Sequence, residues 1–189
     1  MQSQLPPVFG PDAVTTPWMG AVLGHEVEPT DCRLEPIGTG QVGANYRVHL
    51  NWNDDEGPST VVIKFAALDP QSRATGIQVG TYQREGEFYR HVAPTIEVAV
   101  PHLYHVDFVE GTADIVIVME DLDPREQGDQ LGGCSPNEAA LALSEAAKLH
   151  RAFWNDETLF GLAWVSRRNP EQTAQTIALL EGLQPAFVE

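Results

Sequence analysis

The chain has 189 residues, of which 42% are hydrophobic and 20% charged, a composition typical of an ordinary globular protein with a buried core. Its 11 basic and 27 acidic residues give a formal net charge of −16, which opposes binding to nucleic acid or to an anionic membrane surface. The sequence shows no secretory pattern and no apolar run approaching 18 residues, and its two cysteines, Cys32 and Cys134, stand apart. We therefore expect a cytoplasmic protein with no membrane or nucleic-acid partner.

The first 30 residues are predicted to form an arm followed by one short helix. Residues 1–16 are rich in Pro, Gln, Ser and Thr, which is typical of a loosely held terminal segment. Thr16 and Pro17 then supply a cap and a first-turn proline for a helix that ends at Gly24.

Alternating and continuous apolar runs predict five strands, at residues 32–37, 45–52, 61–66, 102–108 and 113–119. A helix is predicted from Thr81 to Pro94, between the third and fourth strands. The stretch before it, residues 68–80, is broken by Pro70, Gly76 and Gly80 and is predicted to be a mobile loop. The result is a small lobe of five strands and one helix.

The polar run after the fifth strand is the expected junction between two lobes. Residues 120–124 break the strand abruptly, and we place a hinge at residues 119–124. Ser135 and Glu138 then form a capping box, with a proline at the first position of a helix that continues to about residue 155. A last helix is predicted over residues 170–183.

Three glycines, Gly38, Gly40 and Gly43, form the pattern G-x-G-x-x-G. In a dinucleotide-binding fold, a helix would begin at the third glycine. The residues after Gly43 instead alternate between apolar and polar, which predicts a strand. A glycine loop between two strands, followed by a strand that ends in Lys64, is typical of the hairpin that covers the nucleotide in kinases. A dinucleotide-dependent oxidoreductase stays an alternative if residues 44–52 are helical.

Lys64 lies in an apolar strand, so its charge requires a partner unless it is simply a lysine at an exposed strand end. Two glutamates compete for this role. Glu85 shares a helix face with Phe88 and Val92 and is the predicted partner, whereas Glu87 points elsewhere and is predicted to be solvated.

In their order along the chain, these elements resemble the amino-terminal half of the aminoglycoside phosphotransferase and choline-kinase-like superfamily of small-molecule kinases. The resemblance covers about residues 30–165 and rests on five segments: Gly38 to Gly43, Val62 to Lys64, Arg84 to Tyr89, Val118 to Leu122 and Leu149 to Trp154. It implies an α+β fold, in which a protein-kinase-like small lobe occupies residues 31–122. This lobe would combine a five-stranded antiparallel sheet with one long helix. The first helices of a truncated helical large lobe would follow over residues 125–189.

The resemblance also implies a site for ATP. The residues it assigns to the nucleotide are Gly38, Gly40, Gly43, Lys64, Glu85, Met119, Glu120 and Leu122. The Glu120 carbonyl and the Leu122 N–H would bind adenine, and Met119 would line the back of the pocket, although Met119 also fits as a simple core residue. Glu120 and Asp121 are discounted as a metal pair, because neighbouring side chains on a strand point to opposite faces.

The family's catalytic loop, of the type H-x-D-x-x-x-x-N, has no counterpart after Trp154. We therefore expect neither a catalytic residue nor a metal ligand in these 189 positions. The catalytic aspartate and the Mg²⁺ ligands are expected beyond Glu189, and the chain alone is expected to be inactive. An exposed apolar face on the helix over residues 136–153 would favour association.

The expected function is the nucleotide-binding portion of an ATP-dependent phosphotransferase that acts on a hydroxyl group of a small molecule. The alternative is a catalytically inactive kinase-like module that binds a nucleotide or a partner protein.

Overall fold

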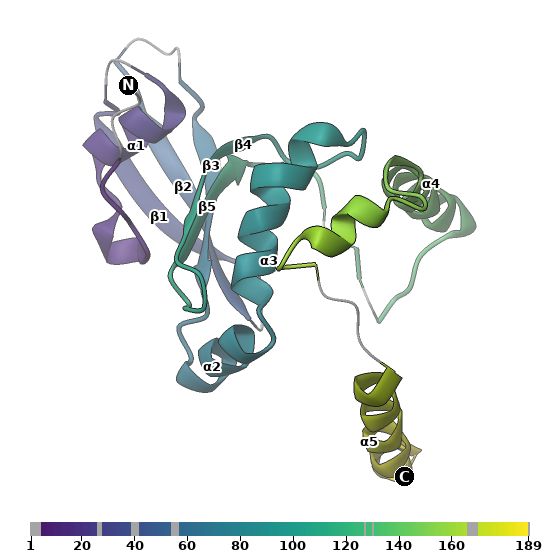
Figure 1. Cartoon of the computed structure of the whole chain (residues 1–189). Coiled ribbons are helices and arrows are strands. Elements are labelled where there is room, and N and C mark those ends of the chain that lie inside the picture. The colour runs from purple at the N-terminus through teal and green to yellow at the C-terminus, as the bar shows by residue number, and fades with distance from the viewer. Residues whose placement is uncertain are drawn as a thin grey trace. The chain divides into compact units, whose positions relative to one another are not determined.

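The computed structural model describes residues 5–25, 28–38, 42–53, 57–126, 128–129, 131–165 and 170–188 (Figure 1). Its contacts divide the chain into two compact units, residues 1–152 and 153–189. The first unit contains the sheet and the helices α1 to α4, and the second contains α5. In the described part of the chain, no helix has both the length and the apolar character needed to cross a bilayer.

Five strands form one antiparallel sheet in the order β1-β2-β3-β5-β4. They are β1 (Asp31–Ile37), β2 (Gly43–Asn51), β3 (Thr60–Ala66), β4 (Leu103–Phe108) and β5 (Ile115–Glu120). The five predicted strands and the α+β class are confirmed. Because residues 44–51 belong to a strand, the requirement of the dinucleotide-binding alternative is not met. The continuously apolar β5 lies between β3 and β4, and its first five residues are buried.

One face of the sheet is covered by the N-terminal segment, which contains a short 3₁₀ turn, η1 (Pro11–Ala13), and helix α1 (Thr16–Leu23). Trp18 and Met19 of α1 are buried against this face, and Val8 belongs to the same core cluster. The prediction of a loosely held arm is therefore wrong for residues 5–15. The apolar face of β2 and β3 needs a cover, and apolar residues spaced without periodicity along this segment provide it.

The segment predicted to be a mobile loop contains helix α2 (Pro70–Gln78), so that prediction is wrong. Pro70 is the first residue of the helix, where a proline loses no intrahelical hydrogen bond. The Asp69 side chain caps the helix by accepting a hydrogen bond of 2.7 Å from the Ser72 N–H. Gly76 allows the ring of Tyr82 to pack against α2 at van der Waals distance.

The opposite face of the sheet is covered by α3 (Thr81–Glu87), as Figure 1 shows. The helical path continues through a π-helical turn, η2 (Phe88–Val92), and a 3₁₀ turn, η3 (Ala93–Thr95). The predicted long helix is therefore present, with a change of hydrogen-bonding pattern after Glu87. At Gly86 the helix lies against β4 so closely that an added Cβ would be 2.3 Å from the Phe108 ring.

The remaining elements are α4 (Pro136–Ala152), the 3₁₀ turn η4 (Glu157–Gly161) and α5 (Pro170–Val188). The predicted capping box of α4 is confirmed, because Ser135 and Glu138 exchange backbone-to-side-chain hydrogen bonds of 2.6 and 3.3 Å. No residue of α4 is buried, and Leu141 and Leu143 are each 70% exposed. The predicted association through this helix stays a prediction.

Candidate functional site

A cavity of about 460 Å³ lies on the α3 side of the sheet. This volume is within the range of small-molecule and cofactor sites. Its walls come from the end of β1, from β2 and β3, from α3 and η2, and from the segment that follows β5. The lining residues are Ile37, Gly38, Asn45, Arg47, Val62, Lys64, Glu85, Tyr89, Pro101, Met119, Glu120, Asp121, Leu122, Asp123 and Arg125.

Lys64 and Glu85 form an ion pair inside this cavity, with 2.6 Å between Nζ and Oε1. The predicted partner is therefore confirmed. The side chains are 28% and 23% exposed, so the pair is partly shielded from water while the ammonium group remains accessible. Lys64 has three N–H donors, and Glu85 is its only hydrogen-bond acceptor among the described residues. Two donors are thus left for an anion.

The glycines predicted for the site have different surroundings. Gly38 lines the cavity with a φ of +72°, a conformation that other residues rarely adopt. Gly43 is the first residue of β2, and an added Cβ would be 2.8 Å from the Lys64 Cε. The absent side chain therefore leaves the space that the lysine stem occupies. Gly40 lies outside the described residues.

The prediction that Glu87, the second glutamate of the helix, is solvated is wrong. The Glu87 side chain is only 18% exposed, and its carboxylate lies 3.3 Å from His91, one turn further along. The helix packs on the sheet mainly through Tyr82 and Gly86, which are buried. The helix face on which each glutamate lies therefore predicted the partner of Lys64 correctly, but it did not predict the partial burial of Glu87.

The segment after β5 forms one end of the cavity. Met119 is 9% exposed and both lines the cavity and belongs to the core, so the two interpretations of this residue are compatible. The Glu120 N–H donates to the His102 carbonyl over 2.8 Å, and its carboxylate accepts from the His102 N–H over 3.1 Å. Leu122 lines the cavity, and its N–H has no hydrogen-bond acceptor within the described part of the chain.

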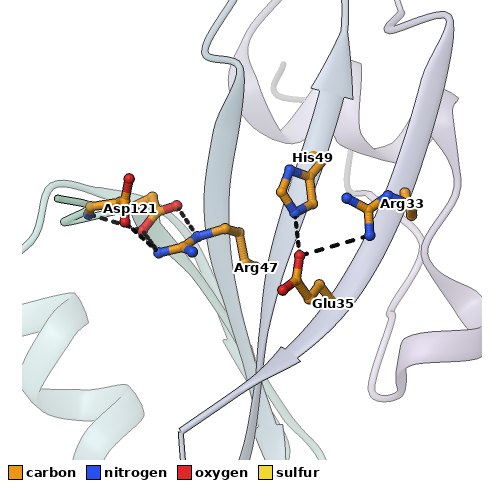
Figure 2. A network of polar contacts seen from close by, with 6 residues as sticks. Arg33, Glu35, Arg47, His49 and Asp121 are labelled. Atoms are coloured by element: carbon orange, nitrogen blue, oxygen red, sulfur yellow. Dashed lines mark hydrogen bonds and ion pairs between the residues drawn. The ribbon is translucent and has the colours of Figure 1, made fainter.

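A second cation, which the sequence analysis did not assign to the site, lies at this same end. Arg47 of β2 donates from Nε to Asp121 Oδ2 over 2.6 Å and from Nη2 to Asp121 Oδ1 over 3.1 Å. Nη2 also donates to Asp123 Oδ1 over 3.3 Å. Figure 2 shows the side chain extending from its strand toward Asp121. This two-point geometry fixes the plane of the guanidinium group.

Asp121 stays ionised in this arrangement. Burial alone would raise the pKa of its carboxyl group. The hydrogen bonds from Arg47, the Asp123 N–H and the Thr60 hydroxyl, together with the charge of Arg47, hold that pKa below its ordinary value. The hydrogen bond to Asp121, followed by the charges of Asp121, Asp123 and Glu35, raises the pKa of Arg47. With its oxygens already engaged, Asp121 has little capacity left to bind a metal ion or a ligand.

A second polar network lies nearby, between β1 and β2 (Figure 2). His49 Nε2 lies 2.7 Å from Glu35 Oε2, and Arg33 lies 3.7 Å from the same oxygen. The hydrogen bond with His49 is the main cause of the lowered pKa of Glu35. None of the three residues lines the cavity, and Glu35 and Arg33 are exposed, so this network is a surface feature.

The sequence contained a signal for Arg47 that was not used. In a strand, alternate residues share a face, so Gly43, Asn45 and Arg47 lie on one side of β2. The register pairs Asn45 with Lys64, which places Arg47 on the same side as the predicted lysine. Its carboxylate partner could not be found in this way, because that contact depends on the strand order. Tyr89, which lines the cavity beside Glu85, was also missed; burial and then the charge of Glu85 raise its pKa.

No protein-family model matches the chain, and no curated protein matches it. The described residues also contain no group of three His, Cys, Asp or Glu side chains that could hold a metal ion. Ile37, Val62, Met119 and Leu122 form an apolar strip in the lining of the cavity, beside two cations that are each held by a carboxylate. Such a cavity suits a ligand with a flat apolar ring at one end and an anionic group at the other.

Proposed function

We propose that this chain is the nucleotide-binding portion of an ATP-dependent phosphotransferase that phosphorylates a hydroxyl group of a small molecule. The observation that carries the proposal is the ion pair between Lys64 and Glu85. The lysine lies on the third strand of an antiparallel sheet, and the glutamate lies on the helix between the third and fourth strands. In protein kinases, a lysine in this position holds the phosphates of ATP, and a glutamate in this position forms the ion pair that holds the lysine in place.

Three further features support the same proposal. The strand order places β3 beside β5, so Lys64 and the segment after β5 line one cavity. The apolar strip between them fits an adenine ring, and the Leu122 N–H supplies a donor at its edge. Gly38 and Gly43 flank the connection between β1 and β2; Gly38 lines the cavity, and Gly43 lies against the stem of Lys64.

The proposal assigns Mg²⁺ to no residue of this chain. Asp121 is engaged by Arg47, and the described residues contain no metal-binding cluster. The proposal leaves the Mg²⁺ ligands and the aspartate that orients the substrate hydroxyl unassigned. A kinase-like module that binds nucleotide without transferring phosphate would have the same cavity, so the two proposals differ only in phosphate transfer.

Equilibrium binding of ATP to the 189-residue chain tests the nucleotide site directly. We expect micromolar to millimolar affinity, and we expect Lys64→Met to weaken it by at least tenfold because two phosphate donors are lost. The matched control is Lys148→Met. Lys148 is the only other lysine and forms an ion pair of the same length, 2.6 Å, with Glu145 on α4.

Because the chain has only two lysines, chemical acetylation followed by mass spectrometry gives an independent test. We expect ATP to protect Lys64 and to leave the labelling of Lys148 unchanged. Equal labelling of both lysines at saturating ATP, or no ATP binding at millimolar concentration, would remove the nucleotide proposal.

A further inference from the structure

Arg47 lies where a ligand in the cavity would meet it. Its strand register pairs it with Val62 of β3, and Val62 in turn pairs with Met119 of β5. The side chain bonds to Asp121, just beyond the end of β5, so the contact crosses the whole of β3 on the cavity side. Two strand spacings amount to roughly 10 Å. Arg47 thus spans one end of the cavity.

The hydrogen bonds of Arg47 leave part of its guanidinium group unused. Of its five N–H donors, Nε gives one bond and Nη2 gives two. Nη1 carries the other two, and it has no acceptor among the described residues. The side chain is 27% exposed, compared with 5% for Asp121. The buried Asp121 carboxylate therefore holds the guanidinium group in place, and the N–H donors that remain free are those of Arg47.

The free donors of Arg47 favour an acceptor on a ligand that reaches them. The acceptor capacity of Asp121 is taken by Arg47, the Asp123 N–H and the Thr60 hydroxyl. Arg125 is a third cation in the lining of the cavity, which also contains Glu120 and Asp123. A ligand atom next to Arg47 can accept a hydrogen bond from it if that atom is a ring nitrogen, a carbonyl oxygen or a sugar hydroxyl oxygen.

The position of Lys64 defines which part of a nucleotide would reach Arg47. Lys64 and Val62 are two residues apart on β3, or roughly 7 Å. Their cavity-side neighbours on β2 are Asn45 and Arg47, in that order. With the phosphates at Lys64, the base and the sugar extend along the apolar strip toward Arg47.

We propose that Arg47 is a specificity-determining residue of the cavity that donates a hydrogen bond to the nucleoside part of the ligand, while Asp121 and Asp123 hold it in place. The proposal rests on the proposed function, because it requires a nucleotide with its phosphates at Lys64. It divides the cavity into a phosphate end and a nucleoside end, each with its own cation.

Three probes separate the two ends: ATP, adenosine and inorganic tripolyphosphate. We expect Arg47→Met to weaken the binding of ATP and of adenosine by the same factor, about tenfold, and to leave tripolyphosphate within twofold. We expect the opposite pattern for Lys64→Met, with a loss for ATP and tripolyphosphate and none for adenosine. Each dissociation constant would be measured by calorimetry on the full chain.

Two further variants show whether the effect comes from the donor itself. Arg33→Met is the matched control, because Arg33 lies on the neighbouring strand, is exposed and does not line the cavity. It is expected to leave all three dissociation constants unchanged. Arg47→Lys keeps a positive donor without the planar fork, so we expect it to restore part of the adenosine affinity.

The outcomes distinguish this proposal from the nucleotide site itself. An equal loss for all three probes in Arg47→Met would mean a purely structural role, and no loss for any of them would mean no role; either result overturns the assignment of Arg47 alone. If the unaltered chain binds neither ATP nor adenosine, the nucleotide site and the Arg47 assignment fall together.

Discussion

The two charged ends of the cavity use the same chemistry in different settings. At one end, Lys64 of β3 and Glu85 of α3 are 21 positions apart, and both side chains are about one-quarter exposed. At the other end, Arg47 is anchored by Asp121, which is only 5% exposed and receives hydrogen bonds from several groups. The first pair leaves its cation accessible to an anion. The second holds its cation rigidly and exposes only one edge of it.

Because of this difference in burial, the two ion pairs are expected to contribute differently to ligand binding and to the stability of the fold. A partly hydrated pair such as Lys64 and Glu85 contributes little to stability, because water competes for both charges. A carboxylate as buried as Asp121 cannot lose its partner without a larger penalty. We therefore expect substitutions at the lysine end to affect ligand binding most, and substitutions at the arginine end to affect both ligand binding and stability.

The largest expected effect on stability comes from the helix that carries Glu85. Gly86→Ala would place a Cβ 2.3 Å from the Phe108 ring, so α3 must move away from β4. The strain from overpacking exceeds the gain in helix propensity, and we expect a net loss of about 2 kcal/mol in the free energy of unfolding. Urea denaturation measures it. The movement should also disturb the Lys64–Glu85 pair and lower the affinity for tripolyphosphate.

Two variants test this explanation. Gly182→Ala is the matched control, since Gly182 lies in a helix and an added Cβ would meet nothing within 4 Å. We expect it to leave stability unchanged or slightly raised. In the double variant Gly86→Ala/Phe108→Leu, the smaller side chain should recover part of the loss. A Gly86→Ala protein as stable as the unaltered chain would mean that α3 is not held closely against β4.

A smaller effect is expected at the arginine end. Asp121→Asn keeps the shape of the side chain but removes the charge that Arg47 binds, and we expect a loss of about 1 kcal/mol at pH 7. Because the pKa of Asp121 is lowered in the folded protein, its contribution is fully present above the ordinary aspartate pKa of about 3.9. As the pH falls below that value, the contribution disappears. The difference between the two proteins should therefore stay constant from pH 7 to about pH 5 and shrink below about pH 4.

Urea denaturation of both proteins across this pH range measures the difference. Other acidic groups with lowered pKa values destabilise both proteins equally in acid, so the difference reports on Asp121. Glu85→Gln is the companion variant, and we expect it to lower the free energy of unfolding by less than Asp121→Asn does at pH 7. If Glu85→Gln proved the more costly of the two, the proposed division between a binding end and a stabilising end would be wrong.

The contrast between the two ends also explains which parts of the site the sequence could predict. Lys64 and Glu85 each carry a local signal, a charge in an apolar strand and a position on a helix face. The contact between Arg47 and Asp121 joins residues 74 positions apart. It exists only because β5 inserts beside β3, and neither residue carries that information in its neighbourhood.

The fold errors have a similar origin. The five strands follow from alternation and from apolar runs, which are local patterns. Taken alone, Pro70 predicts a break in a helix, but the preceding Asp69 caps a helix in which Pro70 is a first-turn proline. Val8 lies in a segment with no periodicity, and its burial depends on the exposed sheet face that it covers. Local patterns thus predicted the strands, whereas contacts between distant segments determine which segment covers each face of the sheet.

The smallest expected effect concerns the network of Arg33, Glu35 and His49, which resembles the arginine end in appearance only. Its distances are as short as 2.7 Å, yet Glu35 and Arg33 are well exposed to water. Solvent and salt screen such a pair, and ordering long side chains offsets the remaining attraction. We expect Glu35→Gln to leave the urea midpoint at pH 7 and 0.15 M salt unchanged, although the hydrogen bond with His49 lowers the pKa of Glu35. A shift as large as that of Asp121→Asn would show that burial is not what separates the two networks. The rigidity attributed to Arg47 would then need another source.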